Sequence, residues 1–440
     1  MAPRTRRLLL ALSVGLVLAD SSVVTLALPD ILAQFDVEIA TLAWALTSFN
    51  LALAVSALPA AFAARRRPVP VFGAGIVVFA VASLTCAFAP SFGVLVGART
   101  VQGVAGAAIV CAALDLLAGV DARAGRTWAF AGVLGASLGP AAGGILTQLL
   151  GWESIFAVQA PIALVALLAL AGGTVVTVRT RVERPHVAAN VALLLVSGAL
   201  VAALFLLVIL LINGWRLEPL EAGLVVTVMP LAAIAAARYA ERITPPWARA
   251  ASGAVLISGG LAALGWLPHA GAIWTVLPQL AVGAGLGLAL STLTERALAG
   301  REALGVHGGW TIASRHAGVV LGLLLLTPIF VAGLDRNEDD ALAAGTSAVL
   351  DSRISPLDKI GVARDVLVAV DEAKEETRVP DVEKVIDHSD DPDYRDLASD
   401  LQDQLDRAVT NAFSRSFLAA ALLGLLALIP ILLDRREASA

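Results

Sequence analysis

The chain has 440 residues, of which 58% are hydrophobic and 15% are charged, and its formal net charge is −5. Soluble globular chains carry roughly 45–50% apolar and about 25% charged residues, so this composition excludes an ordinary soluble domain. The apolar residues fall into runs of about 20, the length that a helix needs to cross a hydrocarbon core of about 30 Å. Transmembrane barrel strands alternate in polarity and are about half as long, so the runs predict an all-α membrane protein.

The runs predict twelve transmembrane helices. Those of the first half are Leu8–Leu28, Leu42–Ala64, Val69–Ala89, Phe92–Gly119, Thr127–Leu150 and Ile155–Val178. Those of the second half are Asn190–Ile212, Ala222–Tyr239, Ala250–Leu267, Ile273–Leu293, Val306–Val331 and Asn411–Leu433. The first run follows three arginines, as a secretory signal would, but Asp20 lies in its middle and no small-residue cleavage site leads into a soluble chain. We therefore predict that it is a span.

The short loops between the predicted spans differ in charge on the two sides of the membrane. One set of loops, together with the amino terminus and Arg435-Arg436, holds nearly all the arginines, whereas the opposite short loops hold one base, Arg216. Lys and Arg are enriched in cytoplasmic loops. We therefore predict a multi-pass protein of the cell membrane with both termini in the cytoplasm.

We expect the chain to be divided at the predicted loops. The expected parts are an N-terminal six-helix bundle at 1–178, a cytoplasmic linker at 179–189, a C-terminal bundle at 190–334 and 411–434, and a cytoplasmic tail at 435–440.

Residues 335–410 separate the last two predicted spans and carry 21 Asp and Glu against 9 Lys and Arg. The predicted topology places this acidic insert outside the cytoplasm. Ser355-Pro356 is a helix start signal, and a second helical pattern begins near Pro392 and runs into the last span. We expect these helices to pack on each other as a small cap. A module that guides the substrate or binds an extracytoplasmic protein partner is the alternative.

Four stretches carry recognisable patterns. They are Asp20 followed by a run that ends in Ala27-Leu28-Pro29, then Arg99-x-x-Gln102-Gly103, then Gly135-x-x-x-Gly139-Pro140-x-x-Gly143-Gly144, and finally Trp152-x-x-Ile155-Phe156. In order and spacing they resemble the drug:proton antiporter branch of the major facilitator superfamily. The resemblance implies twelve helices in two six-helix pseudo-repeats that rock around a midplane cavity, and it implies proton-coupled efflux of the multidrug-resistance type.

The sequence departs from the family pattern in two places. The loop between the second and third spans lacks the family's latch aspartate, since Ala64 stands at that position, and Arg67 stands where a second glycine is expected. This departure puts in doubt the charged latch that closes the cytoplasmic side in the family. The link Val178–Asn190 is also too short for the two extra central spans of the fourteen-helix relatives.

Asp20 and Arg99 are the strongest candidates for proton coupling. An ionisable group at mid-depth in a membrane costs several kcal/mol unless it is paired, protonated or hydrated, so Asp20 is either a proton carrier or a structural partner for polar groups on neighbouring helices. Arg99 stays charged and needs carbonyl or carboxylate partners. Gln102, one helical turn further on, can share either task. Arg315, deep in the eleventh span, is a further candidate for the cavity.

The remaining candidates fall into two groups. The glycines around Pro140 permit a close helix contact, and the resemblance implies that they form a hinge or a seal against leakage. The residues that could line the cavity are Ser21, Ser22, Thr25 and Asp115, the last at the inner mouth. We expect His307 and His316 to be packing or interface residues.

No phosphate-binding loop, zinc-ligand spacing or nucleophile elbow is found, so we expect no enzyme, cofactor, metal site or nucleic-acid partner. The sequence instead predicts a secondary transporter that exports lipophilic or amphipathic small molecules in exchange for protons, with membrane lipid around it. Two alternatives stay open. One is a lipid or glycolipid exporter that uses the insert, and the other is a transport-inactive receptor or scaffold.

Overall fold

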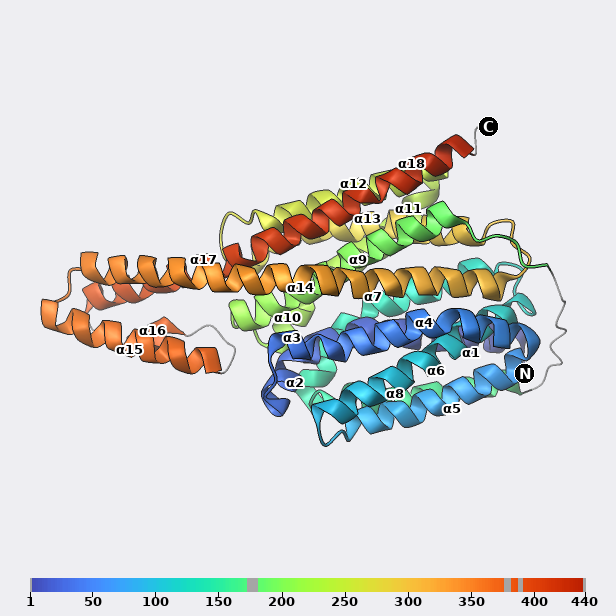
Figure 1. Ribbon diagram of the computed structural model, residues 1–440, viewed down its shortest axis with the longest axis horizontal. Helices are drawn as coiled ribbons and strands as arrows, with labels where there is room; N and C mark the ends of the chain where they lie inside the picture. The colour runs from blue at the N-terminus through green and yellow to red at the C-terminus, as the bar shows by residue number, and fades with distance from the viewer. Residues whose placement is uncertain (1, 172–180, 376–380, 387–390, 438–440) are drawn as a thin grey trace.

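The computed structural model describes residues 2–171, 181–375, 381–386 and 391–437. Within these ranges it contains no strand, and twelve of its helical segments are long and apolar enough to cross a membrane. The predicted all-α fold with twelve spans is confirmed. Figure 1 shows the spans side by side in one elongated bundle, with both termini at the same end.

Six spans form the N-terminal half. They are α1 (Pro3–Val23) continued by η1 (Val24–Ala27) and α2 (Leu28–Phe35), then α4 (Trp44–Arg66), α5 (Pro68–Ala87), α6 (Phe92–Ala118), α7 (Ala124–Leu150), and α8 (Glu153–Val165) with η2 (Ala166–Leu170). A short helix, α3 (Ile39–Leu42), links the first two spans.

The C-terminal half also contains six spans. Its spans are α9 (Val187–Ile209) with η3 (Leu210–Gly214), then α10 (Pro219–Val226) with α11 (Val228–Tyr239) and η4 (Ala240–Arg242), α12 (Pro246–Gly265), α13 (Ala272–Leu298), α14 (Leu304–Asp351), and α17 (Pro392–Leu426) with α18 (Leu428–Glu437). Proline opens three of these segments and also α5, because its fixed φ suits the first helical position and its missing N–H needs no partner there.

The two halves are built on the same packing pattern. In the first half the first span packs on the fifth, α1 on α7, and the second on the fourth, α4 on α6. In the second half α9 packs on α14 and α11 on α13, which are the equivalent pairs. The halves meet mainly through α4 against α14 and α7 against α10. This arrangement agrees with the predicted six-helix pseudo-repeats.

Two of the predicted helix ends were wrong, those of the first and the eleventh span. The first span does not end at Leu28 but continues to Phe35, and the eleventh helix does not end near Val331 but runs to Asp351. In both places the apolar run stops where the lipid would stop, while the helix continues into polar sequence. The predicted end of the sixth span at 172–178 and the first residues of the linker, 179–180, lie outside the described residues.

The insert projects from the end of the bundle opposite the termini (Figure 1). It consists of the extended end of α14, then α15 (Pro356–Glu375), α16 (Val382–Val385) and the start of α17. The predicted helix starts at Pro356 and Pro392 are therefore confirmed. The insert has a small hydrophobic core of its own, formed by Val349, Ile354, Val362, Val382, Ile386, Leu397, Ala398 and Leu401.

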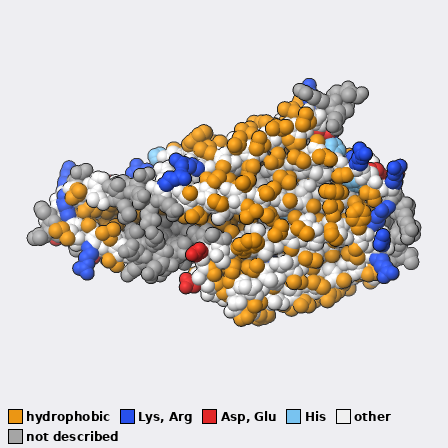
Figure 2. All heavy atoms as spheres, viewed as in Figure 1, with side chains coloured by type: hydrophobic (Ala, Val, Ile, Leu, Met, Phe, Trp, Pro, Cys, Tyr) orange, Lys and Arg blue, Asp and Glu red, His pale blue; other side chains and the backbone are white. Residues whose placement is uncertain are grey.

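The surface matches a chain that is embedded in lipid. Figure 2 shows hydrophobic side chains over the flank of the bundle, and Lys and Arg gathered at the end that carries the termini. Large apolar residues such as Leu149, Leu277 and Leu324 are more than half exposed on this flank or elsewhere on the spans. Extensive exposed apolar surface of this kind marks contact with a membrane.

Candidate functional site

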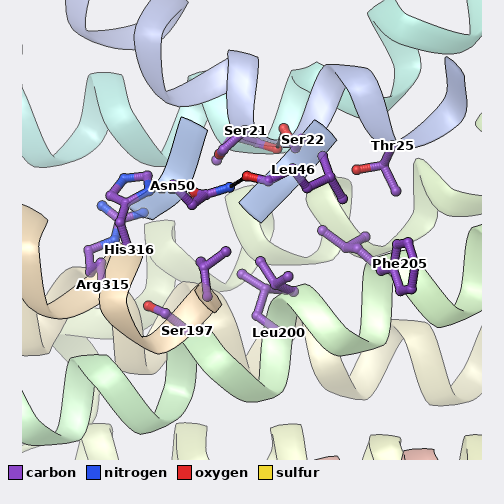
Figure 3. Close-up of a pocket in the computed structure, with 14 residues that line it drawn as sticks. Ser21, Ser22, Thr25, Leu46, Asn50, Ser197, Leu200, Phe205, Arg315 and His316 are labelled. Atoms are coloured by element: carbon purple, nitrogen blue, oxygen red, sulfur yellow. Dashed lines mark hydrogen bonds between the residues drawn. The ribbon is translucent and has the colours of Figure 1, made fainter. Parts of the chain in front are cut away.

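A cavity of about 60 Å³, lined by both polar and apolar side chains, lies between the two halves of the bundle (Figure 3). Its polar lining comes from four spans, with α1 and η1 facing α9 and α14. The polar lining residues are Ser21, Ser22, Thr25, Asn50, Ser197, Arg315 and His316, and the apolar ones include Leu46, Leu200, Val201, Leu204, Phe205 and Val319. The structure therefore brings together four of the residues that the sequence placed at the cavity: the three hydroxyl residues and Arg315.

The cavity is too small for a drug-sized molecule in this conformation. Ligand pockets usually enclose about 300–1,000 Å³. The halves touch on both sides of the cavity. At the end that carries the termini the Gly305 N–H donates to Asp115 Oδ1 over 3.0 Å, and at the end that carries the insert the Leu220 N–H donates to Gln148 Oε1 over 2.8 Å. Cargo of ordinary size can enter only when one of these ends opens.

One hydrogen bond crosses directly between the halves at the cavity. Nδ1 of His316 on α14 lies 2.7 Å from Oδ1 of Asn50 on α4. The expectation that His316 is an interface residue agrees with this contact. Nε2 of His316 and Nε of its neighbour Arg315 are buried without a hydrogen-bond partner among the described residues. Two nitrogen atoms in the C-terminal wall of the cavity are thus buried and unpaired among the described residues.

Asp20 lies next to the cavity but does not line it. Its side chain is fully buried, and Oδ2 forms an ion pair with Nη1 of Arg99, which is also fully buried. Its other oxygen, Oδ1, accepts a hydrogen bond of 2.6 Å from Nε2 of Gln159. Gln102 completes a ring, since its Oε1 lies 2.7 Å from Arg99 Nη1 and its Nε2 lies 2.8 Å from Gln159 Oε1.

The ring therefore joins α1, α6 and α8 inside the N-terminal half. We expected Asp20, Arg99 and Gln102 at the cavity, and the structure places them one layer behind it. Gln159 was missed by the sequence analysis, and so was Ser83, whose hydroxyl accepts a bond of 2.8 Å from Gln102. The signal for Gln159 was present, because an amide in the middle of an apolar span needs hydrogen-bond partners.

Arg99 is held on every side by the N-terminal half. Its Nε donates to the Ala45 carbonyl over 3.2 Å, and its guanidinium carbon lies 4.3 Å from the ring centre of Phe49 and 5.5 Å from that of Phe156. Aromatic faces attract cations most strongly where water is excluded. Its Nη2 is the one atom of the group without a hydrogen-bond partner among the described residues.

The helix that carries Asp20 is broken directly after it. The regular turns of α1 end at Val23, the tighter helix η1 covers Val24–Ala27, and Pro29 stands at the start of α2. A 3₁₀ stretch inside a helix often marks a hinge. The same short segment thus holds the buried carboxylate, the cavity-lining hydroxyls of Ser21 and Ser22, and the break.

The glycine motif holds α7 tightly against α1. A Cβ on Gly135 would collide with the Gly15 carbonyl oxygen, and one on Gly139 would collide with the Ser22 hydroxyl. Ser22 Oγ in turn lies 3.0 Å from the carbonyl oxygen of Ala136 on α7. Small residues permit backbones to approach closely in a membrane, where packing rather than the hydrophobic effect joins helices.

The other members of the motif extend this contact. Gly143 faces the carbonyl of Val23 on α1, whereas Gly144 faces Pro219 and Gly223 of α10 in the other half. Pro140 lies inside α7 without ending the helix. The motif therefore forms a close three-helix junction around the cavity-lining segment of α1.

Asp115 does not line the cavity, contrary to the sequence-based expectation. It lies near the end of α6, where its Oδ1 accepts the backbone N–H of Gly305 in the first turn of α14. A carboxylate at a helix N-terminus is stabilised by the unpaired N–H groups and by the helix dipole. Ala64, at the position of the missing latch aspartate, is fully buried. In this chain a carboxylate from the fourth span makes the contact between the halves at this end.

Two further polar contacts lie at this end, one between the halves and one between the linker and the C-terminal half. Arg126 and Glu241 form an exposed ion pair of 2.7 Å. Glu183, in the linker, accepts the Glu302 N–H over 3.1 Å and lies 3.1 Å from Nε2 of His307. Backbone N–H groups, that of Glu183 itself and that of Glu302, hold the pKa of the Glu183 carboxyl below its usual value, and His307 adds to this effect.

Two halves of six spans each, with a polar cavity between them, define the fold of a secondary transporter. The model of the Major Facilitator Superfamily matches residues 10–323 of the chain. The chain therefore belongs to the Major Facilitator Superfamily and is a multi-pass membrane transporter.

Efflux proteins are among the curated relatives. The chain is 35% identical over 185 residues to the drug efflux pump JefA of Mycobacterium tuberculosis (strain ATCC 25618 / H37Rv), a match that covers 39% of this chain and 36% of that protein. It is 39% identical over 171 residues to the multidrug efflux pump LfrA of Mycolicibacterium smegmatis (strain ATCC 700084 / mc(2)155), covering 36% of this chain and 33% of that protein.

A third relative is the tetracenomycin C resistance and export protein of Streptomyces glaucescens, 35% identical over 207 residues that cover 44% of this chain and 37% of that protein. Each match spans about a third of the relative's own length. Among solved structures, a bacterial homolog to the human lysosomal transporter Spinster, inward-facing and unoccupied, is similar with a TM-score of 0.65 at 14% identity, covering 98% of both chains. At this identity the likeness shows the fold alone.

Proposed function

We propose that this transporter exports lipophilic or amphipathic small molecules in exchange for protons, by alternating access of its two halves. The observation that carries the proposal is the position of Asp20. It is a fully buried carboxylate, and the next two residues of the same helix, Ser21 and Ser22, line the central cavity. A change in the charge of Asp20 therefore acts on the segment that forms the cavity wall.

The coupling follows from the contacts of the carboxylate. While Asp20 is ionised, its ion pair with Arg99 and its bond from Gln159 hold α1 against α6 and α8. A proton on Asp20 cancels the charge that binds Arg99. Because α1 gives way to the 3₁₀ segment η1 four residues further on, the released helix can move together with the cavity wall.

The lining and the relatives support a drug-like cargo. Leu46, Leu200, Val201 and Phe205 give the cavity apolar walls beside its polar lining residues. Sugar-binding sites need many polar partners, whereas sites of this composition suit ligands with a large apolar body. The efflux proteins that this chain resembles point in the same direction.

The basic end of the bundle supports a cytoplasmic location of both termini, by the excess of Lys and Arg in cytoplasmic loops. Cysteine labelling tests this orientation, since Cys86 and Cys111 are both buried and give little background. An impermeant maleimide should label Asp400→Cys in intact cells and Arg66→Cys only after the cells are opened. The opposite result would reverse the topology.

The function is tested in proteoliposomes that hold the whole chain. A pH gradient should drive accumulation of lipophilic dyes of different charge against their gradients, and a protonophore should abolish it. A panel in which no dye moves uphill would contradict export of lipophilic compounds. Uphill movement that survives the protonophore would contradict proton coupling.

A further inference from the structure

Arg315 is a buried cation without a compensating carboxylate in the described structure of the cavity. Its side chain lines the cavity and is 8% exposed, and its Nε has no hydrogen-bond partner. None of the described residues that line the cavity is Asp or Glu. A buried charge of this kind is costly unless it is paired or hydrated, so the site is poised to accept a negative group.

The carboxylate of Asp20 is already occupied. Both oxygens of Asp20 are bound inside the N-terminal half, one by Arg99 and the other by Gln159. The Asp20–Arg99 pair has no net charge, whereas Arg315 adds a full positive charge to the cavity. The field in the cavity is therefore positive, which attracts anions and repels cations.

The other polar groups suit the same kind of ligand. The hydroxyls of Thr25 and Ser197 can donate hydrogen bonds to an oxygen, whereas those of Ser21 and Ser22 already donate to backbone carbonyls of the N-terminal half. Figure 3 shows the hydroxyl groups of α1 and η1 on one side of the cavity, with Arg315, His316 and Ser197 on the other. The guanidinium itself binds carboxylates and phosphates with two parallel N–H groups.

We propose that the cargo carries an acidic group on an apolar body, and that Arg315 binds the anion in the central cavity. This inference rests on the proposed export function, because it names the class of exported molecule. Its test measures binding and not export. The present cavity has room for an acidic head or a few waters, and Leu200, Val201 and Phe205 lie where the apolar body begins. A cationic drug would meet Arg315 with like charge and without a free carboxylate.

Three probes with the same aromatic body separate charge from apolarity. They are pyrenebutyrate, pyrenebutanol and pyrenebutylamine, which are an anion, a neutral molecule and a cation at neutral pH. Binding is measured on the whole chain in phosphatidylcholine nanodiscs, so that no anionic lipid competes, with empty nanodiscs subtracted. The acid should bind about ten-fold more tightly than the alcohol, because hydrogen bonds to a charged group are worth roughly a factor of ten or more. The amine should bind most weakly.

Two variants of Arg315 test whether this residue causes the preference for the acid over the alcohol. Arg315→Gln should reduce the affinity for the acid to that for the alcohol and leave the alcohol unchanged, while Arg315→Lys should keep part of the preference. The matched control is Arg249→Gln, since Arg249 on α12 is also 8% exposed but does not line the cavity and donates to the Ile243 carbonyl. This control should keep the full preference for the acid. The thermal unfolding midpoint of each variant checks that it folds.

Three results would overturn the inference: no binding of the acid, equal affinity for acid and alcohol in the wild type, or a preference for the acid that survives in Arg315→Gln. Proton-driven efflux of pyrenebutanol, measured in parallel, separates this inference from the proposed function. Efflux of the alcohol without a preference for the acid contradicts the inference alone. A preference for the acid without any uphill efflux contradicts the proposed function alone.

Discussion

The two halves of this transporter each bury an arginine inside the membrane, but they treat the charge differently. Arg99 of the N-terminal half is fully buried and is neutralised by Asp20, with Gln102, the Ala45 carbonyl and two aromatic rings around it. Arg315 of the C-terminal half lines the cavity, and no Asp or Glu stands among its described lining residues. Arg99 and Arg315 are the same residue type but have different surroundings.

We propose that the two arginines have different tasks. A paired charge behind the cavity wall can hold or release a helix when its partner takes up a proton. A charge that faces the cavity can bind a ligand instead. Because the two sites lie in different halves, movement of the halves changes their separation, and this geometry would link proton binding to cargo binding.

The largest expected effect comes from breaking the paired site. Arg99→Gln leaves the Asp20 carboxylate buried with Gln159 as its remaining partner, so the variant should lose about 3–5 kcal/mol of unfolding free energy. Arg315→Gln removes a cation that has no carboxylate among the described residues of the cavity lining, and should lose little. Chemical unfolding in detergent measures both. The double variant Asp20→Asn with Arg99→Gln should recover most of the loss, and a similar loss in all three variants would refute the contrast between the halves.

A smaller effect should follow from the glycine contact of the N-terminal half. A Cβ at position 139 would collide with the Ser22 hydroxyl and would lie 2.8 Å from the Ala19 carbonyl oxygen. Gly139→Ala should therefore push α7 away from α1, at a cost of about 2–3 kcal/mol, and should impair transport. Gly97→Ala is the control, because nothing lies within 4 Å of a Cβ there. Equal stability of the two variants would show that this contact is not tight in the folded protein.

Gln159 offers a finer test of the paired site. Gln159→Leu removes the donor to Asp20 Oδ1 but keeps the ion pair with Arg99, so the expected loss is about 1.5 kcal/mol, the low end for a bond to a charged group. Gln159→Glu would add a second carboxylate beside Asp20 and should cost more. Wild-type stability of Gln159→Leu would show that the hydrogen bond from Gln159 does not stabilise the buried Asp20 site.

The smallest effect on the bundle is expected from the insert, which has its own core. Val382 is fully buried there, so Val382→Asp should make the insert sensitive to protease while the unfolding free energy of the bundle changes by less than about 0.5 kcal/mol. Leu367→Asp is the control, since Leu367 is 53% exposed in α15. Unfolding of the whole chain by Val382→Asp would instead make the insert a structural cap of the bundle.

The sequence predicted the spans well because each is a continuous apolar run whose length the membrane dictates. It failed at the end of α14 because acidic residues after Leu334 end the apolar run, although Ala-rich sequence there still forms a helix to Asp351. The end of a hydrophobic run reports the edge of the lipid, not the end of the helix.

The candidate site was predicted in part for a related reason. Asp20, Arg99 and Arg315 were found because charges inside apolar spans are rare and costly. Their partners could not be read from the pattern, since Gln159 meets Asp20 only after α8 has packed against α1. Asp115 was only a possible lining residue of the inner mouth, and the pattern could not show that α14 begins beside it. Contacts between distant helices decide which polar residues face the cavity and which face each other.

Substrate-linked proton movement in proteoliposomes tests the central claim most directly. Addition of pyrenebutanol to vesicles that hold the wild-type chain should start proton flow, reported by a pH-sensitive dye in the lumen. Asp20→Asn, which keeps the shape of the residue but replaces one acceptor oxygen by an amide NH₂ and cannot take up a proton, should abolish this flow, while Arg315→Gln should retain it. Proton flow in Asp20→Asn at the wild-type rate, with the protein folded, would contradict the account.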